Sequence, residues 1–294
     1  MQAKEQFRTI GLIGRMGSEL VGESLHQLIE LLDKHGLSIV IEENTATILP
    51  GDNHQKGSRK MMGEICDLII VVGGDGCLLG AARDFARSRV SLLGINRGRL
   101  GFLTDISPQN INTLVTEVLN GQYLLEERFL LEAEVVRDGR PIGESSALND
   151  VVFHSGSSIT MLEFELFIEG QFVYCQRSDG IIISTPTGST AYALSGGGPI
   201  MHPNLDAIVL VPMFPHTLSS RPLVVGGNSE IKIVVSKNNE CSPRLTSDGQ
   251  GDISVEPGDV LYVRKKSHKM KLLHPLNHSF YESCRSKLGW SEVL

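Results

Sequence analysis

Residues 73–76 place an aspartate inside a run of glycines, Gly73-Gly74-Asp75-Gly76, directly after the apolar residues 68–72. A glycine-rich turn after a buried strand brings backbone N–H groups close to phosphate oxygens, and the following helix adds its positive N-terminal dipole. The turn therefore suits a polyphosphate. A carboxylate there opposes phosphate binding unless it has a chemical role. Asp75 could accept the proton of an attacking hydroxyl or hold magnesium, although aspartate is also common in turns and helix caps.

Two glycine clusters raise a rival prediction, a dinucleotide-binding dehydrogenase. Glycines 74, 76 and 80 form a loosened dinucleotide fingerprint, and glycines 11, 14 and 17 form a second glycine-rich turn. Such an enzyme places an acid about 20 residues after its glycines to bind the ribose. Here that stretch ends in Asn96 and Arg97, which argues against a dehydrogenase. The GxxxxGK[ST] phosphate loop is also absent, so a kinase cannot be inferred from that motif.

A second polar constellation covers residues 177–199, RSDGIIISTPTGSTAYALSGGGP. It places an apolar strand between two polar turns, the second of which is rich in hydroxyl groups and glycine. Many neutral donors and acceptors in one place suit a nucleotide. A loop made only of turn-forming residues would not explain Arg177, Asp179 and Tyr192 together.

Other polar residues carry weaker signals. Asn149-Asp150 precedes a short apolar strand and could read adenine edges or hold ribose hydroxyls, although such a pair is more often a turn. His216 lies among turn residues, which favours a structural or interface role. His274 and His278 have the spacing of metal ligands on a helix, but a proline follows His274 and HExxH is absent, so zinc is not expected.

The first part of the chain alternates short β-branched runs with longer segments of helical period, as in a parallel sheet with crossover helices. We expect strands at 9–13, 37–41, 67–72 and 90–95, helices at 18–35, 78–87 and 110–119, and a loop at 50–60. From about residue 126 the period changes to two. The chain's 294 residues therefore predict an α/β domain at 1–125 and a β-rich domain at 126–274, with the weakly helical tail 275–294 packing on the first.

The net charge of −7 gives no reason to expect nucleic acid or an anionic membrane as a partner. The basic run Arg264-Lys265-Lys266 is interpreted as a solvated edge strand. Five cysteines without a CxxC pair predict neither a disulfide framework nor a zinc cluster and fit a reducing cytoplasm. No apolar run is long enough to span a bilayer.

In combination, these motifs resemble those of the bacterial NAD kinases, the ATP-NAD kinase family. The resemblance rests on GGDG, NRGRLGFL at 96–103, LND at 148–150, the block at 177–200, PMFPHTLSSRPLVV at 212–225 and Asp248-Gly249-Gln250, in the order of the family. GGDG alone is shared with a wider superfamily of lipid kinases and phosphofructokinases, whereas TPTGSTAY is specific.

The resemblance implies a Rossmann-like N-terminal domain, an all-β C-terminal domain and a site between them, where ATP phosphorylates the 2′-hydroxyl of the adenosine ribose of NAD. It also implies magnesium bound with ATP, no metal held directly by the protein, and a homodimer or homotetramer. Asp75 matches the proton acceptor, and Gly73 and Gly74 belong to the phosphate turn. The other matched NAD contacts are Gly76, Asn149, Asp150, Arg177, Asp179, Thr190, Ala191, Tyr192, Ala193, Leu194, Ser195 and Gln250.

Two alternatives stay open at this point. A lipid or sugar kinase would share GGDG but lack TPTGSTAY, and a non-catalytic sensor of NAD or NADP would need the glycine turns without turnover. Arg97 and Arg99 could contact phosphate, but a loop arginine is more often a solvated charge, so neither is assigned.

Overall fold

The computed structural model describes residues 7–98, 101–156 and 160–290, which form two compact units. The first unit contains residues 7–127 and 270–290, and the second contains residues 128–269. Arg99 and Leu100 of the NRGRLGFL segment lie outside the described residues. Among those described, no helix is both long and apolar enough to cross a membrane.

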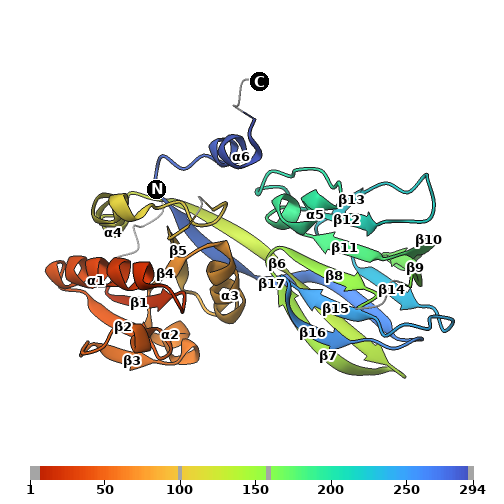
Figure 1. Ribbon diagram of the computed structural model, residues 1–294, viewed down its shortest axis with the longest axis horizontal. Helices are drawn as coiled ribbons and strands as arrows, with labels where there is room; N and C mark the ends of the chain where they lie inside the picture. Colours follow the sequence, from red (N-terminus) through yellow and green to blue (C-terminus); the bar gives the residue numbers. More distant parts are fainter. Residues whose placement is uncertain (1–6, 99–100, 157–159, 291–294) are drawn as a thin grey trace. The chain divides into compact units, whose positions relative to one another are not determined.

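The first unit is built on a parallel sheet (Figure 1). Its neighbouring strands are β5 (Ser91–Asn96), β4 (Leu68–Gly73), β1 (Thr9–Gly14), β2 (Ser38–Glu42) and β3 (Gln55–Gly57). The end of β17 (Val260–His274) adds a further parallel strand beside β5. Because β4 and β1 are covered on both faces, β4 is apolar throughout and β1 is apolar after Thr9, with no alternation of polar and apolar residues.

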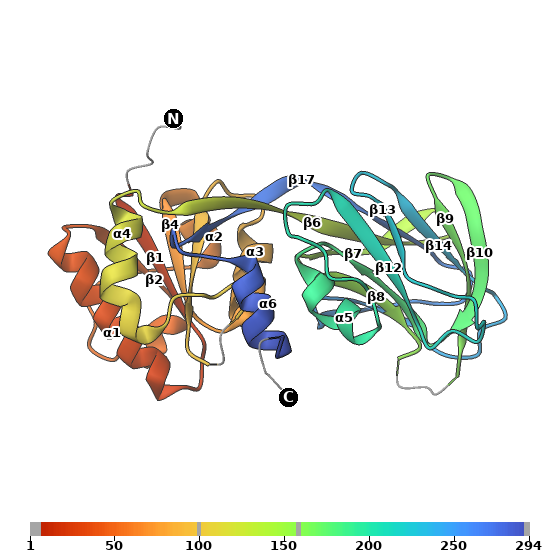
Figure 2. The ribbon, with the colours of Figure 1, turned by 90° about the horizontal axis from the view of Figure 1, so that it is seen from above.

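The helices of this unit cover both faces of the sheet. They are α1 (Glu19–Lys34), α2 (Arg59–Ile65), α3 (Asp75–Phe85) and α4 (Thr116–Leu119), and the unit also contains α6 (Phe280–Leu288), which follows β17 in the chain. Short 3-10 turns lie at Thr45–Ile48 and Pro108–Asn110, and a π-helical turn at Ile111–Val115 precedes α4. In Figure 2, α1 and α4 lie on one side of the sheet, and α2 and α3 lie on the other.

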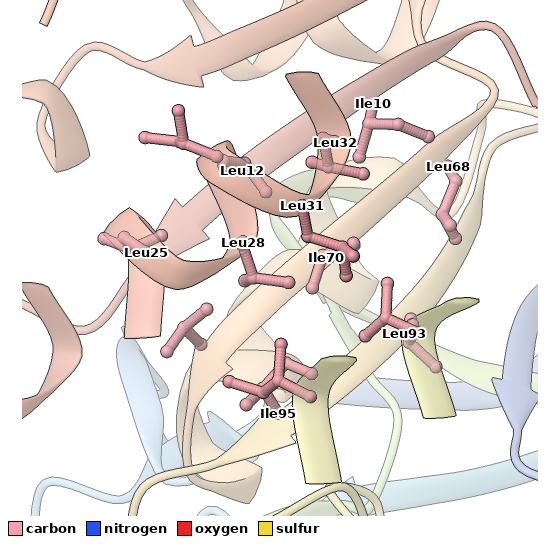
Figure 3. Packing of buried hydrophobic residues seen from close by; sticks show 14 of the residues in the cluster. Ile10, Leu12, Leu25, Leu28, Leu31, Leu32, Leu68, Ile70, Leu93 and Ile95 are labelled. Atoms are coloured by element: carbon pink, nitrogen blue, oxygen red, sulfur yellow. The ribbon is translucent and has the colours of Figure 1, made fainter. Parts of the chain in front are cut away.

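The predicted apolar face of the first helix is confirmed. Leu25, Leu28, Ile29 and Leu32 of α1 are buried against residues of β1 and β4, including Leu12 and Ile70 (Figure 3). Gly36 ends this helix region with a positive φ of 67°, a conformation that suits glycine.

Two predictions about this unit were wrong. The expected loop at 50–60 contains β3 and the start of α2, and the helix expected from residue 78 already begins at Asp75. Glycine has a low helix propensity, which concealed the first turn of α3 in the sequence. The correction matters because it places Asp75 at the N-terminus of a helix.

The second unit is an antiparallel β-sandwich, in agreement with the predicted all-β domain. One sheet contains β7 (Arg140–Ala147), β6 (Leu124–Arg137), β17, β14 (Ile231–Val235), β9 (Leu162–Ile168) and β10 (Gln171–Ser178). The other contains β13 (Leu223–Gly226), β12 (Ala207–Met213), β11 (Gly180–Ser184), β8 (Asp150–His154), β15 (Arg244–Ser247) and β16 (Gln250–Ser254). Between them, the rings of Phe153 and Phe164 pack edge to face at 5.7 Å.

The interpretation of the basic run as an edge strand was wrong. Arg264 to Lys266 belong to β17, which pairs with both β14 and β6. Two of these basic side chains form ion pairs with acidic residues: Arg264 Nε lies 2.7 Å from Glu230, and Lys265 Nζ lies 2.6 Å from Asp206.

Candidate active site

Asp75 is the first residue of α3 and follows the glycine turn that ends β4. A side-chain carbon at Gly74 or Gly76 would meet no described protein atom within 4 Å, so the turn faces open space at both positions. Gly73 is more confined, because a Cβ there would lie 3.1 Å from the Cβ atoms of Arg15 and Cys77. An open glycine turn at a helix N-terminus is a suitable place for a phosphate.

The carboxylate of Asp75 is held by the segment 102–104. The backbone N–H of Phe102 donates to Oδ2 at 2.7 Å. The backbone N–H groups of Leu103 and Thr104 and the Thr104 hydroxyl donate to Oδ1 at 3.2, 3.1 and 3.0 Å. Donors at both oxygens fix the orientation of the carboxylate. The NRGRLGFL segment therefore contributes by positioning the acid.

Gly101 makes this arrangement possible. A Cβ atom on Gly101 would overlap Asp75 Oδ1 and Thr104 Oγ1. The glycine thus allows the backbone of the segment to approach the carboxylate closely.

A lysine from the C-terminal helix completes the surroundings of Asp75. Lys287 Nζ lies 3.7 Å from Asp75 Oδ2, and both side chains are 27% exposed. The same ammonium lies 4.6 Å from the centroid of the Phe102 ring. Sequence reasoning did not identify Lys287, since no local pattern links a lysine in the tail to the glycine turn.

In the second unit, Asp248 holds the start of β8. Its carboxylate accepts the backbone N–H groups of Leu148, Asn149 and Asp150 at 3.0, 2.8 and 3.3 Å. Asp248 has a positive φ of 52°, and its own N–H donates to the Asp150 carbonyl at 2.9 Å. Sequence reasoning placed Asp248 in the DGQ motif without a role of its own.

A pocket of about 610 Å³ lies over this turn, a volume in the range of small-molecule sites. Its lining includes Asn149, Asp150, Asp179, Ala191, Tyr192 and Asp248. Residues 150, 152 and 154 of β8 face the pocket, whereas Val151 and Phe153 point into the core of the sandwich. The structure thus brings together five of the residues predicted to contact the dinucleotide.

Asp150 is the most perturbed acid in this pocket. Burial and the neighbouring charge of Asp248 raise the pKa of Asp150 to about 7, against the lowering effect of the Tyr192 backbone N–H. Near neutral pH this side chain can therefore donate a hydrogen bond as well as accept one.

The hydroxyl groups of the TPTGSTAY block mostly bond within the protein. The Thr185 hydroxyl donates to the Leu148 carbonyl at 2.5 Å and accepts the Gly188 N–H at 3.1 Å. Ser189 donates to the Pro186 carbonyl at 2.7 Å and accepts the Met201 N–H at 2.9 Å. The block therefore shapes the loop that presents Ala191 and Tyr192, rather than offering every hydroxyl to a ligand.

The other predicted contacts are placed differently. Ala193 is buried in a cluster with Val152 and Ile182, and it belongs to the short helix α5 (Tyr192–Ser195), which also carries Leu194 and Ser195. Thr190 donates to the Thr187 carbonyl at 3.3 Å. Arg177 has a 65% exposed side chain on β10, and Gln250 is the exposed first residue of β16. None of these predicted contacts, Arg177, Thr190, Ala193, Leu194, Ser195 and Gln250, is among the residues that line the pocket.

His274 and His278 meet at Asp105, which sequence reasoning also missed. The Nδ1 atoms of His274 and His278 lie 2.9 and 2.7 Å from the same Asp105 oxygen, and Nε2 of His274 lies 3.3 Å from Glu126. The two rings stack at 3.8 Å with an angle of 21°. Asp105, His274 and His278 are close enough to hold a metal ion, but Asp105 Oδ2 already lies at hydrogen-bonding distance of both Nδ1 atoms. The geometry favours a hydrogen-bonded cluster.

Comparisons with known proteins give consistent matches. The sequence model of the ATP-NAD kinase N-terminal domain matches residues 10–123, and that of the ATP-NAD kinase C-terminal domain matches residues 148–275. An NAD kinase of Marinobacter nauticus is 59% identical over 290 residues, covering 99% of each chain. An NAD kinase of Hahella chejuensis is 61% identical over 287 residues, covering 98% of this chain and 97% of the relative.

Two solved structures share the fold. Yeast NADH kinase complexed with NADH has a TM-score of 0.91 at 24% identity, covering 99% of this chain and 90% of that one. An NAD kinase from Archaeoglobus fulgidus in complex with ATP has a TM-score of 0.75 at 23% identity, covering 96% and 98%.

Proposed function

The chain belongs to the ATP-NAD kinase family, whose reaction is the phosphorylation of NAD by ATP to give NADP, and we propose that Asp75 is the base in that transfer. The match to both family domains goes against a lipid or sugar kinase that shares only GGDG. The observation that supports Asp75 is its place at the N-terminus of α3, beside the open glycine turn.

A secondary ribose hydroxyl is a weak nucleophile, and a positioned carboxylate that accepts its proton contributes about 10²–10⁴-fold to the rate. The segment 102–104 orients Asp75, because its backbone N–H groups donate to both carboxylate oxygens. The open backbone at Gly74 and Gly76 gives phosphate oxygens access to N–H donors. Most of the remaining catalysis in phosphoryl transfer comes from positioning and charge neutralisation.

For NAD itself, we propose the pocket of the second unit, with Asn149, Asp150, Asp179 and Tyr192 as contacts. Gly76, Arg177, Thr190, Ala191, Ala193, Leu194, Ser195 and Gln250 stay proposed contacts through the family resemblance. Asp150 and Asn149 together supply donors and acceptors of the kind that a base edge or a ribose requires.

A divalent cation is proposed to arrive with ATP rather than on a protein ligand. Asp75 is already surrounded by N–H donors and an ammonium group, so its carboxylate is a poor ligand for magnesium. When bound to the phosphates, the cation would neutralise part of their charge.

We also propose that the protein forms a homodimer or homotetramer and works in the cytoplasm. The assembly rests on the family resemblance, and the five unpaired cysteines fit a reducing compartment. Light scattering coupled to size-exclusion chromatography would measure the assembly directly.

The test of Asp75 is the substitution Asp75→Asn. With ATP, magnesium and NAD, the variant should form NADP about 10²–10⁴-fold more slowly while binding NAD with nearly the wild-type Kd by calorimetry. Asp84→Asn is the matched control, because Asp84 lies on the same helix but pairs with Arg59. An Asp75→Asn enzyme that retains most of its kcat would rule out Asp75 as the base.

A further inference from the structure

Lys287 and Phe102 converge on one oxygen of Asp75. The Phe102 N–H occupies Oδ2 at 2.7 Å, and the Lys287 ammonium lies 3.7 Å from the same atom while resting over the Phe102 ring. Oδ1 is held separately by Leu103 and Thr104. The ammonium of Lys287 therefore lies beside Oδ2, whereas the Thr104 hydroxyl donates to Oδ1.

The helix that carries Lys287 is fixed at both ends. The Ser279 side chain accepts the Glu282 N–H at 3.3 Å at the start of α6, and Gly289 ends it with a left-handed φ of 67°. Cys284, one turn before Lys287, is fully buried. Lys287 thus lies one turn after the buried part of a capped helix.

The segment that orients Asp75 is also tied to the approach to α6. Thr104 bonds to Asp75, and the next residue, Asp105, bonds to His274 and His278, which precede the helix. The side chains of His274 and His278 are 0% and 6% exposed, so these hydrogen bonds are shielded from water. One short segment therefore fixes both the carboxylate and the base of the helix that brings the ammonium.

During phosphoryl transfer to a hydroxyl, a cation beside Asp75 would reduce the repulsion between the carboxylate and the phosphate oxygens. The O–P bond to the ribose forms while the bond to the ADP leaving group breaks, and the hydroxyl proton passes to Asp75. For this to occur, the phosphorus must lie about 3–3.5 Å from the hydroxyl oxygen, which itself lies within hydrogen-bonding distance of Asp75. Phosphate oxygens and a carboxylate then approach each other closely, and the glycine turn lacks the lysine of a P-loop.

We propose that Lys287 is a second catalytic residue, whose ammonium pairs with Asp75 before the reaction and binds the phosphoryl group during transfer. The proposal rests on the function proposed above for Asp75. When Asp75 accepts the proton, it loses its negative charge, and its electrostatic attraction to the Lys287 ammonium weakens. The flexible four-carbon stem of lysine then lets the ammonium follow the charge on the phosphoryl oxygens.

The main test replaces Lys287 by methionine, which keeps the stem and removes the charge. Lys287→Met should lower kcat about 10²–10³-fold, the usual cost of removing one donor to developing charge, with KM for NAD within about threefold of wild type. Lys287→Arg keeps a cation and should retain within about tenfold of wild-type kcat. Ethylammonium added to Lys287→Ala should restore activity in a saturable way, which a purely structural role would not produce.

Arg285→Met is the matched control, because Arg285 is the other basic residue in the last turn of α6. It should keep wild-type kcat, and circular dichroism should show all variants folded. A Lys287→Met kcat within about twofold of wild type, or a loss that neither arginine nor ethylammonium restores, would overturn the proposal. If Asp75→Asn is inactive while Lys287→Met is active, only the role of Lys287 fails; if Asp75→Asn is active, the proposed function fails first.

Discussion

The Asp248 carboxylate accepts the backbone N–H of Asn149 at 2.8 Å, although the two residues are 99 positions apart in the chain. Two further N–H groups of the same turn donate to this carboxylate, which fixes the start of β8 beside the pocket. Together with burial, which is the larger cause, the charge of Asp248 raises the pKa of Asp150. The turn between β15 and β16 therefore fixes the backbone of a proposed NAD contact, Asp150, and contributes to the raised pKa of its side chain.

Replacing Asp248 by alanine should weaken NAD binding and stability together. Three backbone N–H groups lose their acceptor, at a cost of roughly 1–3 kcal/mol in the free energy of unfolding. We expect KM for NAD to rise about tenfold with a smaller change in kcat, as for lost binding geometry. Urea unfolding and steady-state kinetics measure the two effects. Asp252→Asn is the control, because Asp252 is half exposed on β16 and pairs with Arg244; an unchanged KM in Asp248→Ala would contradict the assigned role.

Asp150→Asn should gain stability over wild type as the pH rises. The pKa of Asp150 is about 7 in the folded protein and about 3.9 when unfolded, so the folded state holds a proton that the unfolded state releases between these values. Wild type therefore loses roughly 1.4 kcal/mol per pH unit across this window, and the asparagine variant avoids that loss. Denaturant unfolding at pH 4.5, 6 and 7.5 should show a growing difference. A difference that does not change with pH would mean that Asp150 titrates normally.

In the glycine turn, we expect the substitution Gly74→Ala to lower activity without lowering stability. Gly74→Ala adds a methyl group to open space at an ordinary φ of −117°, so its stability should stay within about 0.5 kcal/mol of wild type. The methyl group would obstruct a phosphate that approaches the backbone, and kcat/KM for ATP should fall at least about tenfold. Gly101→Ala should instead lower stability, because its Cβ overlaps Asp75. Gly22→Ala, within α1, serves as the control for a glycine substitution that leaves turnover intact.

The strand before the glycine turn could be predicted from sequence because it is apolar throughout, as a strand covered on both faces must be. The same signal was missing for β3, a three-residue strand made of Gln55, Lys56 and Gly57, and for the short helix α2. The basic run Arg264 to Lys266 was wrongly predicted to be an edge strand. The ion pairs of Arg264 with Glu230 and of Lys265 with Asp206 join residues that are distant in the sequence, so the local pattern could not reveal them.

The candidate site was predictable where a motif is local and unpredictable where partners come from separate segments. Asp75 and Asn149-Asp150 lie in recognisable turns. No local sequence pattern connects Lys287 to Asp75, and only the position of α6 brings its ammonium to 3.7 Å from the carboxylate. The hydrogen bond between Asp105 and His274 likewise could not be predicted, because it forms only when β17 places His274 beside Asp105.

The cluster of Asp105, His274 and His278 should make stability depend on pH in a predictable direction. Burial disfavours the charged imidazole of His274, but its hydrogen bonds and charge interactions with Asp105 and Glu126 outweigh this effect and raise its pKa. Burial likewise opposes the charge on Asp105, but the two histidines lower its pKa. The raised pKa of His274 stabilises the fold below the unfolded value of about 6.5 and ceases to do so as the pH rises through the folded value. The lowered pKa of Asp105 stabilises the fold above about pH 3.9 and ceases to do so as the pH falls through the folded value.

The stability advantage of wild type over His274→Gln should therefore be largest between about pH 4 and 6.5 and shrink towards pH 9, as measured by denaturant unfolding. Asp105→Asn removes the shared negative charge and should flatten the same alkaline slope. If the stability difference from wild type stays constant from pH 5 to 9 for both His274→Gln and Asp105→Asn, the cluster is not charged.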